Sequence, residues 1–214
     1  CGAPISGYNR YTVAAKSPLT GCFGESEAGG YFGPELKFAG FDAVVITGKA
    51  PQPVYLFIHN GEVEIRDAAG LWGLDNHQTL EKLEDQLADK KIRAATIGPA
   101  GERLVRFANV SNDMEHFNGR TGMGAVMGAK NLKAIIIKGD RKDRPRPAKP
   151  EADKEARSRA LRAIMAEENI TNPKTGGLSL YGTQVLMNIG ELGDQYEIVI
   201  DRELLDKLTV RVEL

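Results

Sequence analysis

The chain has 214 residues, of which 42% are hydrophobic and 27% charged, and its 28 Lys and Arg against 29 Asp and Glu leave a net charge of −1. This length suits one large domain, or one domain and part of another. The near-neutral balance argues against a protein whose main task is to bind nucleic acid, and no apolar run approaches the roughly 20 residues that cross a bilayer.

The cysteine content and the start of the sequence indicate its setting. Cys1 and Cys22 are too few for a disulfide framework, and no signal peptide is visible. We therefore predict a cytoplasmic protein in a reducing compartment. Because the sequence opens on CGAPISGYNR without an initiator Met, we also expect it to be part of a longer protein.

A glycine-rich run follows the first predicted strand, RYTVAA at residues 10–15. The run from Ser17 to Gly40 holds six glycines among 24 residues and ends in a predicted short helix with Pro34 in its first turn. Glycine loses more conformational entropy on folding than other residues, so such a run marks unusual dihedral angles or a close approach of the backbone to another group.

The next elements are predicted from periodicity and turn residues. Asn60-Gly61 is the favoured turn of a hairpin, Asp75 or Asn76 can cap a helix, and Leu80, Leu83 and Leu87 form the core-facing stripe of that helix. In chain order we expect a buried strand at 41–48, the hairpin at 53–67, the helix at 75–90, strands at 92–98, 103–110 and 132–139 with a turn at 99–102, a charged proline-rich linker, helices at 151–169 and 181–193, and two strands at 196–214.

A second glycine cluster, NGRTGMGAVMGAKN at residues 118–131, precedes the strand at 132–139. Strand, glycine loop, short helix and apolar strand thus occur twice, which predicts two similar loops facing two similar parts of one ligand. Glycine loops before helices often bind phosphate, and tight turns in a sheet-rich fold are the alternative. Gly122 to Gly128 do not fit the dinucleotide-binding fingerprint, because no strand ends at the first glycine and the following helix is too short for a crossover.

Several polar residues of these loops are candidate binding groups. Arg10 and Arg120 suit phosphate recognition or stacking on planar rings, with a solvated surface position as the alternative. His116 could transfer a proton or support another group, and Glu27 belongs to a carboxylate pair or to a polar loop surface. No spacing of Cys and His predicts a zinc-type site.

Three blocks of the chain, residues 10–50, 97–113 and 119–139, resemble the aldehyde ferredoxin oxidoreductase family. The resemblance runs in order from about residue 3 to about residue 190. It implies an α+β fold of two related mixed β-sheet halves with short helices. It also implies a tungstopterin-binding N-terminal domain at 1–140, truncated at its start, a linker at 141–150, and the start of a second, helical domain at 151–214 with an atypical tail.

The family's cofactors and reaction follow from the same resemblance. It implies tungsten (or molybdenum) bis-molybdopterin, magnesium, and a 4Fe-4S cluster whose cysteines and catalytic residues belong to later domains, so this chain alone is expected to be catalytically incomplete. The implied reaction of anaerobic metabolism is oxidation of an aldehyde to a carboxylic acid. The implied partners are ferredoxin, a small-molecule substrate, and further copies of the chain or electron-transfer subunits, with no nucleic acid and no membrane.

The resemblance also assigns site residues. Arg10 matches the arginine between the pterin and the cluster, Gly29 and Gly30 match glycines that approach the pterin phosphates beside Glu27 and Ala28, and the second pterin-facing loop contributes His116, Phe117, Gly119 and Arg120. The chain departs from the family at Glu27, where an Asn contributes to the magnesium site, and at His116-Phe117, where an Arg-Ala pair stands. Glu27 is therefore the predicted magnesium ligand, through its carboxylate or its carbonyl.

These departures suggest a subfamily and leave two alternatives. The first is a subunit of a tungsten-dependent aromatic acyl-coenzyme A reductase, and the second is a truncated, non-catalytic cofactor-binding module. The last 20 or so residues depart from the family and are weakly similar to the C-terminal part of phenylacetate–coenzyme A ligases, from which we infer no ligase activity.

Overall fold

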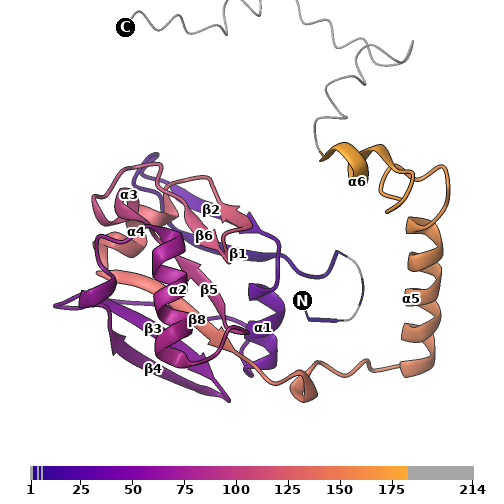
Figure 1. Cartoon of the computed structure of the whole chain (residues 1–214), viewed down its shortest axis with the longest axis horizontal. Helices are drawn as coiled ribbons and strands as arrows, with labels where there is room; N and C mark the ends of the chain where they lie inside the picture. The colour runs from indigo at the N-terminus through magenta and orange to yellow at the C-terminus, as the bar shows by residue number, and fades with distance from the viewer. Residues whose placement is uncertain (1, 4, 6, 183–214) are drawn as a thin grey trace, which may run out of the picture. The chain divides into compact units, whose positions relative to one another are not determined.

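The computed structural model describes residues 2, 3, 5 and 7–182 (Figure 1). By its internal contacts the chain divides into a unit from Cys1 to Asp153 and a second from Lys154 to Leu214. The predicted domain boundary at the linker 141–150 stays a prediction. Most of the predicted helix at 181–193 and both predicted strands at 196–214 lie outside the described residues.

A six-stranded mixed sheet forms the centre of the first unit. Its strand order is β4-β3-β8-β5-β6-β7, with β8 parallel to β3 and antiparallel to β5. The almost wholly buried run of β8, LKAIIIK, is typical of a strand covered on both faces. The six strands are β3 (Val54–His59), β4 (Glu62–Asp67), β5 (Arg93–Thr96), β6 (Val110–Asn112), β7 (His116–Asn118) and β8 (Leu132–Lys138).

A separate two-stranded hairpin precedes this sheet in the chain. Strand β1 (Tyr11–Lys16) pairs antiparallel with β2 (Phe23–Ala28). The α+β class with mixed sheets and short helices is thereby confirmed. The helices are α1 (Phe32–Phe38), α2 (Asn76–Leu87), α3 (Pro99–Glu102), α4 (Met123–Ala129), α5 (Pro150–Ile164) and α6 (Gly177–Tyr181), with the 3₁₀ turns η1 (Ala69–Leu71) and η2 (Arg141–Asp143).

The elements with strong local signals form as predicted. Asn60 and Gly61 have φ of 49° and 79° between β3 and β4, as a two-residue primed turn requires. Helix α2 begins with a capping box between Asp75 and Gln78, and Leu83 is fully buried on its inner face.

Two predicted strands are wrong. Residues 41–48 form no strand, and Val45 is 87% exposed while Val44 and Ile46 pack against the core. The alternation is thus satisfied by side-chain packing, without a ladder to any described strand. The predicted strand at 103–110 is mostly a turn in which Leu104 has φ of 60° and Phe107 is 71% exposed, and only Val110 belongs to a strand.

The glycine-rich loops are also more ordered than their composition indicates. The first contains β2, and the predicted turn at 99–102 is the one-turn helix α3. Without strands at 41–48 and 103–109, the twofold pattern does not have the form predicted. What recurs is a hairpin followed by a short helix, first as β1–β2–α1 and then as β6–β7–α4.

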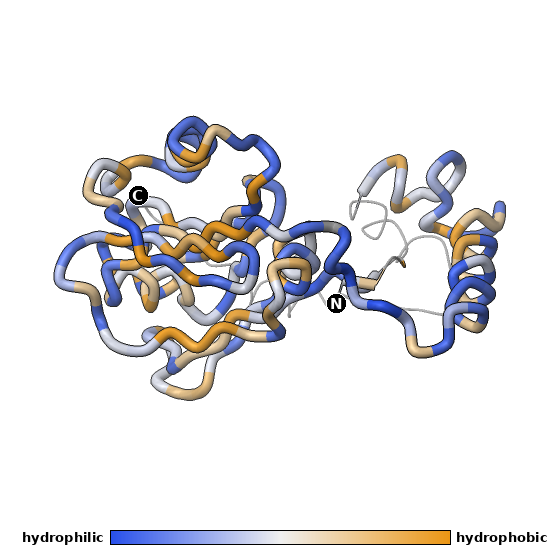
Figure 2. The backbone as a smooth tube through the Cα atoms, turned by 90° about the horizontal axis from the view of Figure 1, so that it is seen from below, coloured by the Kyte–Doolittle hydropathy of each residue, from blue (hydrophilic) through white to orange (hydrophobic). Residues whose placement is uncertain are grey.

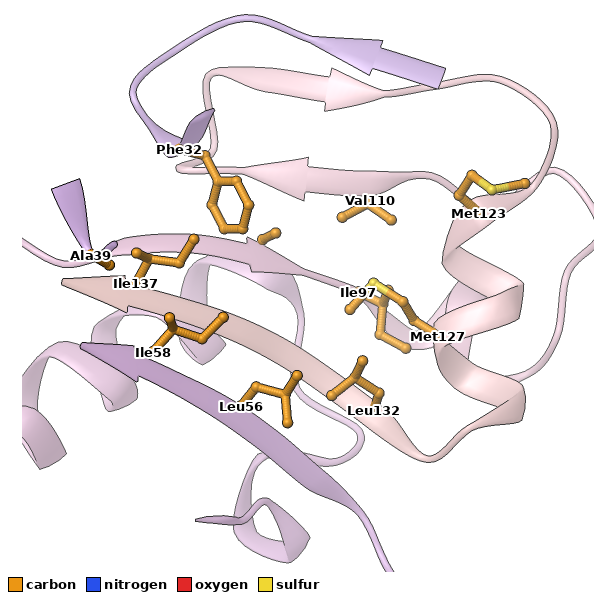
Figure 3. Packing of buried hydrophobic residues seen from close by; sticks show 11 residues of the cluster. Phe32, Ala39, Leu56, Ile58, Ile97, Val110, Met123, Met127, Leu132 and Ile137 are labelled. Carbon is orange, nitrogen blue, oxygen red and sulfur yellow. The ribbon is translucent and has the colours of Figure 1, made fainter. Parts of the chain in front are cut away.

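Hydrophobic side chains cover both faces of the six-stranded sheet. Figure 2 shows apolar stretches concentrated along the strands, while helix α5 is largely hydrophilic and has no buried residue. On one face, α2 packs on a cluster around Tyr55, Leu71 and Ile136. The other face carries the cluster seen in Figure 3: Phe32, Ala39, Leu56, Ile58, Ala95, Ile97, Val110, Met123, Met127, Leu132 and Ile137.

Among the described residues, no helix has the length and apolar character that a bilayer crossing requires.

A buried ion pair joins β8 to α3. The pairing of β3 with β8 shifts register between Val54 and Tyr55, which leaves Lys133 as an extra residue in β8. Its side chain is 0% exposed, and its Nζ donates to Glu102 Oε1 at 2.5 Å and to the Leu74 carbonyl at 2.8 Å. Burial lowers the pKa of Lys133, and the Glu102 carboxylate opposes that shift.

We predict that Lys133→Met destabilises the first unit by about 3–5 kcal/mol, because the substitution leaves the Glu102 carboxylate buried without its counter-ion. Denaturant unfolding of the protein measures this loss. The matched control is Lys138→Met on the same strand, whose half-buried pair with Asp89 at 2.8 Å should contribute about 1 kcal/mol or less. Equal losses for the two variants would contradict the prediction.

Candidate functional site

The two loops that the sequence singles out lie side by side in the structure. Asn112 Nδ2 donates to the Gly29 carbonyl and Asn118 Nδ2 donates to the Ser26 carbonyl, each at 2.7 Å. The Arg120 amide donates to Ser26 Oγ at 3.1 Å. These bonds join β2 and Gly29 after it to β6, to β7 and to Arg120, although β2 belongs to a different sheet from β6 and β7.

Gly29 and Gly30 form the closest approach between the loops. Gly30 has φ of +83°, and a Cβ there would lie 3.0 Å from both Asn112 Nδ2 and His116 Nδ1. A Cβ on Gly29 would lie 3.2 Å from His116 Cδ2. A side chain is therefore disfavoured at Gly30 by the backbone angle, and at either position a Cβ would require the His116 ring to shift.

Two buried polar atoms at this junction have no hydrogen-bond partner among the described residues. They are Asn112 Oδ1, in a fully buried residue, and His116 Nδ1. Leaving such an atom unsatisfied costs about 1–3 kcal/mol. A bound polar group or a water that satisfied them would recover this energy, so the junction suits a polar ligand.

The charged predicted residues lie at the exposed side of the loops. Arg10 NH1 is 3.8 Å from Glu27 Oε2, and their side chains are 66% and 55% exposed. Arg120 is exposed as well, whereas Ala28 is buried. An exposed pair at this distance contributes little stability, so both charges remain available to a ligand.

The remaining predicted site residues differ in their surroundings. Phe117 is partly exposed on β7. Gly119 would place no Cβ within 4 Å of another atom, whereas added Cβ atoms on Gly122, Gly124 and Gly128 would come within 1.9–2.2 Å of backbone oxygens. The last three glycines let α4 pack closely on residues 101–109. For them, tight packing in the fold, and not ligand binding, explains the glycine.

A cavity of about 650 Å³ opens beside this junction. Gly30 and His116 line it together with Tyr8, Asn9 and Tyr31. Its wall thus combines backbone, imidazole, amide and phenol groups, which can hydrogen-bond to a polar ligand and contact a planar one.

Metal ligands are sparse in this region. The described residues contain no group of three or more His, Cys, Asp and Glu side chains that could hold a metal ion. Glu27 would accordingly be a single protein ligand for magnesium, with the other oxygens supplied by phosphate groups and water. Cys22 is exposed and free.

Residues that sequence reasoning missed hold the second loop in place. Asp113 and Met114, with φ of 49° and 63°, form the turn between β6 and β7 without a glycine. Asp113 Oδ1 accepts from the Ala94 amide at 2.7 Å, and Arg93 lies 3.5 Å from its other oxygen and 4.5 Å from the Tyr31 ring centroid. Asn112 directly precedes this turn and Asn118 ends β7, and no local sequence pattern indicates the role of either residue.

Burial has the largest effect on the pKa of Asp113. It raises the pKa of the carboxyl group above its ordinary value, while the hydrogen bond from the Ala94 amide and the Arg93 guanidinium act in the opposite direction. The carboxylate is therefore held at the base of the loop at a cost in desolvation.

The chain has relatives among known proteins. A family model described as "Aldehyde ferredoxin oxidoreductase, N-terminal domain" matches residues 1–139. The chain is 48% identical over 187 residues to the tungsten-containing aldehyde ferredoxin oxidoreductase of Pyrococcus abyssi, covering 87% of this chain and 30% of that protein. It is 42% identical over 151 residues to an aliphatic sulfonate oxidoreductase, WOR-like subunit, of Pyrococcus furiosus, covering 64% and 24%.

A solved structure has the same fold. The BamBC active-site complex of benzoyl-coenzyme A reductase with 1,5-dienoyl-CoA matches with a TM-score of 0.75 and 39% identity, over 78% of this chain and 25% of that chain. The chain thus spans under a third of the length of the proteins that it matches.

We predict that Gly30→Ala destabilises the protein by roughly 1–2 kcal/mol, because an L-residue is forced into a left-handed conformation and its methyl group contacts Asn112 and His116. Gly119→Ala is the control and should change the free energy of unfolding by less than about 0.5 kcal/mol. Thermal or denaturant unfolding measures both, and a Gly30→Ala protein as stable as the wild type would contradict the prediction.

A second prediction concerns pH. Because the pKa of Asp113 is raised in the folded state, its contribution to stability is present at low pH and is lost as pH rises from about 4, the unfolded carboxyl value, through the folded pKa. Asp113→Asn should therefore gain stability relative to the wild type between pH 4 and pH 7 in denaturant unfolding.

Asp89 is the matched control, because its hydrogen bond from Lys138 lowers its pKa. Its contribution is complete above the unfolded value of about 4 and is lost as pH falls through the lowered folded pKa, so Asp89→Asn should lose stability relative to the wild type as pH rises toward 4 and change little from pH 4 to pH 7. The same sign for both variants would refute this assignment.

Proposed function

The chain belongs to the aldehyde ferredoxin oxidoreductase family, and we propose that it supplies the base on which a tungsten bis-pterin cofactor binds, in an enzyme that oxidises aldehydes to carboxylic acids with ferredoxin as electron acceptor. The observation that carries the proposal is the junction of two loops at Gly29, Gly30 and His116. There, Asn112 Oδ1 and His116 Nδ1 have no hydrogen-bond partner within the described residues. The relatives that are named tungsten-containing aldehyde ferredoxin oxidoreductases support it.

The residues of the junction fit such a cofactor. Gly30 lines the cavity without a side chain, so a phosphate could approach its backbone there, and the exposed Arg10 and Arg120 supply cationic groups that suit phosphate and planar rings. His116 and Phe117 would contact the second pterin. When bound, the cofactor supplies the two-electron oxidation, while this chain supplies binding, orientation and electrostatics.

This chain would contribute a ligand to magnesium but none to the 4Fe-4S cluster. Glu27 would give one oxygen ligand to the magnesium ion, in exchange for its contact with Arg10 at 3.8 Å. The cluster, its cysteines and the acid–base residues are assigned to later parts of the enzyme. Ferredoxin and further copies of the chain or electron-transfer subunits are the proposed partners, in the cytoplasm.

A second candidate keeps the cofactor and changes the substrate. The match to the benzoyl-coenzyme A reductase complex supports a role as a subunit of an aromatic acyl-coenzyme A reductase. Assays of the enzyme with a viologen dye separate the two, since aldehyde oxidation supports the first and reaction with an aromatic acyl-coenzyme A ester supports the second. If the protein contains no cofactor even when the cells are supplied with tungstate, both enzyme functions are contradicted. The remaining alternative is then a non-catalytic module that does not carry this cofactor.

We predict that protein purified from cells supplied with tungstate contains tungsten and pterin, and that Arg120→Ala lowers both by roughly tenfold. A lost charge-assisted hydrogen bond of about 1.5–3 kcal/mol has at least this effect on binding. Elemental analysis and the fluorescence of the oxidised pterin measure the two contents. The control is Arg103→Ala, an exposed arginine outside the two loops, and equal cofactor contents in the two variants would contradict a binding role for Arg120.

A further inference from the structure

A chain of hydrogen bonds connects the three segments that carry the proposed cofactor-binding residues. The Tyr11 hydroxyl donates to Asn118 Oδ1 at 2.7 Å, Asn118 Nδ2 donates to the Ser26 carbonyl at 2.7 Å, and Ser26 Oγ accepts from the Arg120 amide at 3.1 Å. We name these four residues the loop clasp. Each segment that it joins is adjacent in sequence to a charged candidate: Arg10, Glu27 or Arg120 itself.

The central residue of the loop clasp, Asn118, is protected from solvent. Asn118 is fully buried, and both polar ends of its side chain are used, one as acceptor and one as donor. Water therefore does not compete for these bonds, and loss of one partner would leave a buried polar atom unsatisfied. Such an amide fixes the distance between the elements that it joins more strictly than apolar contact does.

The Tyr11 end of the clasp is also held firmly. Its ring lies 4.6 Å from the ring of Phe32, and Tyr11 pairs with Ala28 at the end of the hairpin. Burial, with a smaller contribution from Asp113, raises the pKa of Tyr11 well above its ordinary value. The hydroxyl therefore remains a proton donor throughout the pH range in which proteins are folded.

We propose that Asn118 and Tyr11 are positioning residues, which hold the first loop against the second so that Arg10, Glu27 and Arg120 face one bound cofactor at a fixed spacing. The fixed spacing rests on the geometry alone, and its consequence for cofactor binding rests on the proposed function. Neither residue is assigned to contact with the cofactor.

The test uses Tyr11→Phe, which keeps the ring packing and removes only the donor to Asn118. We expect amide hydrogen exchange to quicken by about tenfold, or about 1.4 kcal/mol, in both residues 26–30 and residues 116–121. The matched control is Tyr55→Phe, which removes the hydroxyl of another buried tyrosine, in the core cluster on the opposite face of the six-stranded sheet. It should leave exchange in both loops unchanged.

Pterin content provides the second readout. Protein from tungstate-supplied cells should retain severalfold less pterin as Tyr11→Phe than as Tyr55→Phe, at comparable melting temperatures. Asn118→Asp, which keeps an acceptor for Tyr11 and loses the donor to Ser26, should lower pterin content further. Unchanged exchange in the two loops of Tyr11→Phe, or exchange that quickens equally in Tyr55→Phe, would overturn the inference.

The two proposals can fail separately. Wild-type protein without pterin would refute the proposed function, while the exchange measurement would still decide whether the loop clasp sets the spacing of the loops. Pterin-loaded wild type with equal pterin in Tyr11→Phe and Tyr55→Phe would refute the positioning role and leave the proposed function intact.

Discussion

Side-chain amides, and not a backbone ladder, join the two sheets of this protein at its candidate site. The hairpin β1–β2 and the six-stranded sheet share no strand pairing, so side-chain hydrogen bonds hold β2 beside β6 and β7. Two of these bonds are donated by fully buried residues, Asn112 and Asn118, to the Gly29 and Ser26 carbonyls. A backbone ladder would have used up the polar groups of both strands. Joined in this way, the loops leave Asn112 Oδ1 and His116 Nδ1 without hydrogen-bond partners in the part of the chain that the structure describes.

Other elements of the first unit hold this junction in place. The turn that presents His116 is anchored to β5 through Asp113, and β5 is paired with β8, the buried centre of the sheet. Helix α4 closes on residues 101–109 through glycines that admit no side chain. Lys133 and Glu102 join the same α3 region to β8. The second loop is therefore mounted on rigid elements, which is what a site with fixed geometry needs.

The sequence predicts those parts of the fold that local interactions decide. Asn60-Gly61 determines a primed turn by its own backbone preferences, and the spacing of Leu80, Leu83 and Leu87 determines the inner face of α2. Residues 41–48 have an equally good strand pattern, yet a strand also needs a hydrogen-bonding neighbour, which no local pattern records. The predicted strand at 103–110 was wrong for a related reason, because apolar residues such as Leu104 and Phe107 can also lie exposed in a turn.

The candidate site, too, could be predicted from the sequence only in part. Glycine content and the family resemblance indicated Gly29, Gly30 and Arg120, and the structure places them at one junction. The residues that make the junction were missed, because Asn118 contacts Tyr11 across 107 positions of the chain and Asn112 contacts Gly29 across 83. An asparagine in a sequence carries no mark of such a partner. Their role follows only from burial combined with distance.

The charges at the exposed side of the junction have a consequence for ligand binding. Arg10 and Glu27 neutralise each other at 3.8 Å, across a surface where water screens both. An anionic group would be attracted to Arg10 and repelled by Glu27, so the carboxylate opposes phosphate binding unless a cation lies between them. A divalent cation reverses that sign, because it attracts the carboxylate and the phosphate together. In the proposed function, anion and cation would therefore bind this surface cooperatively, with Arg10 released from Glu27 to face the anion.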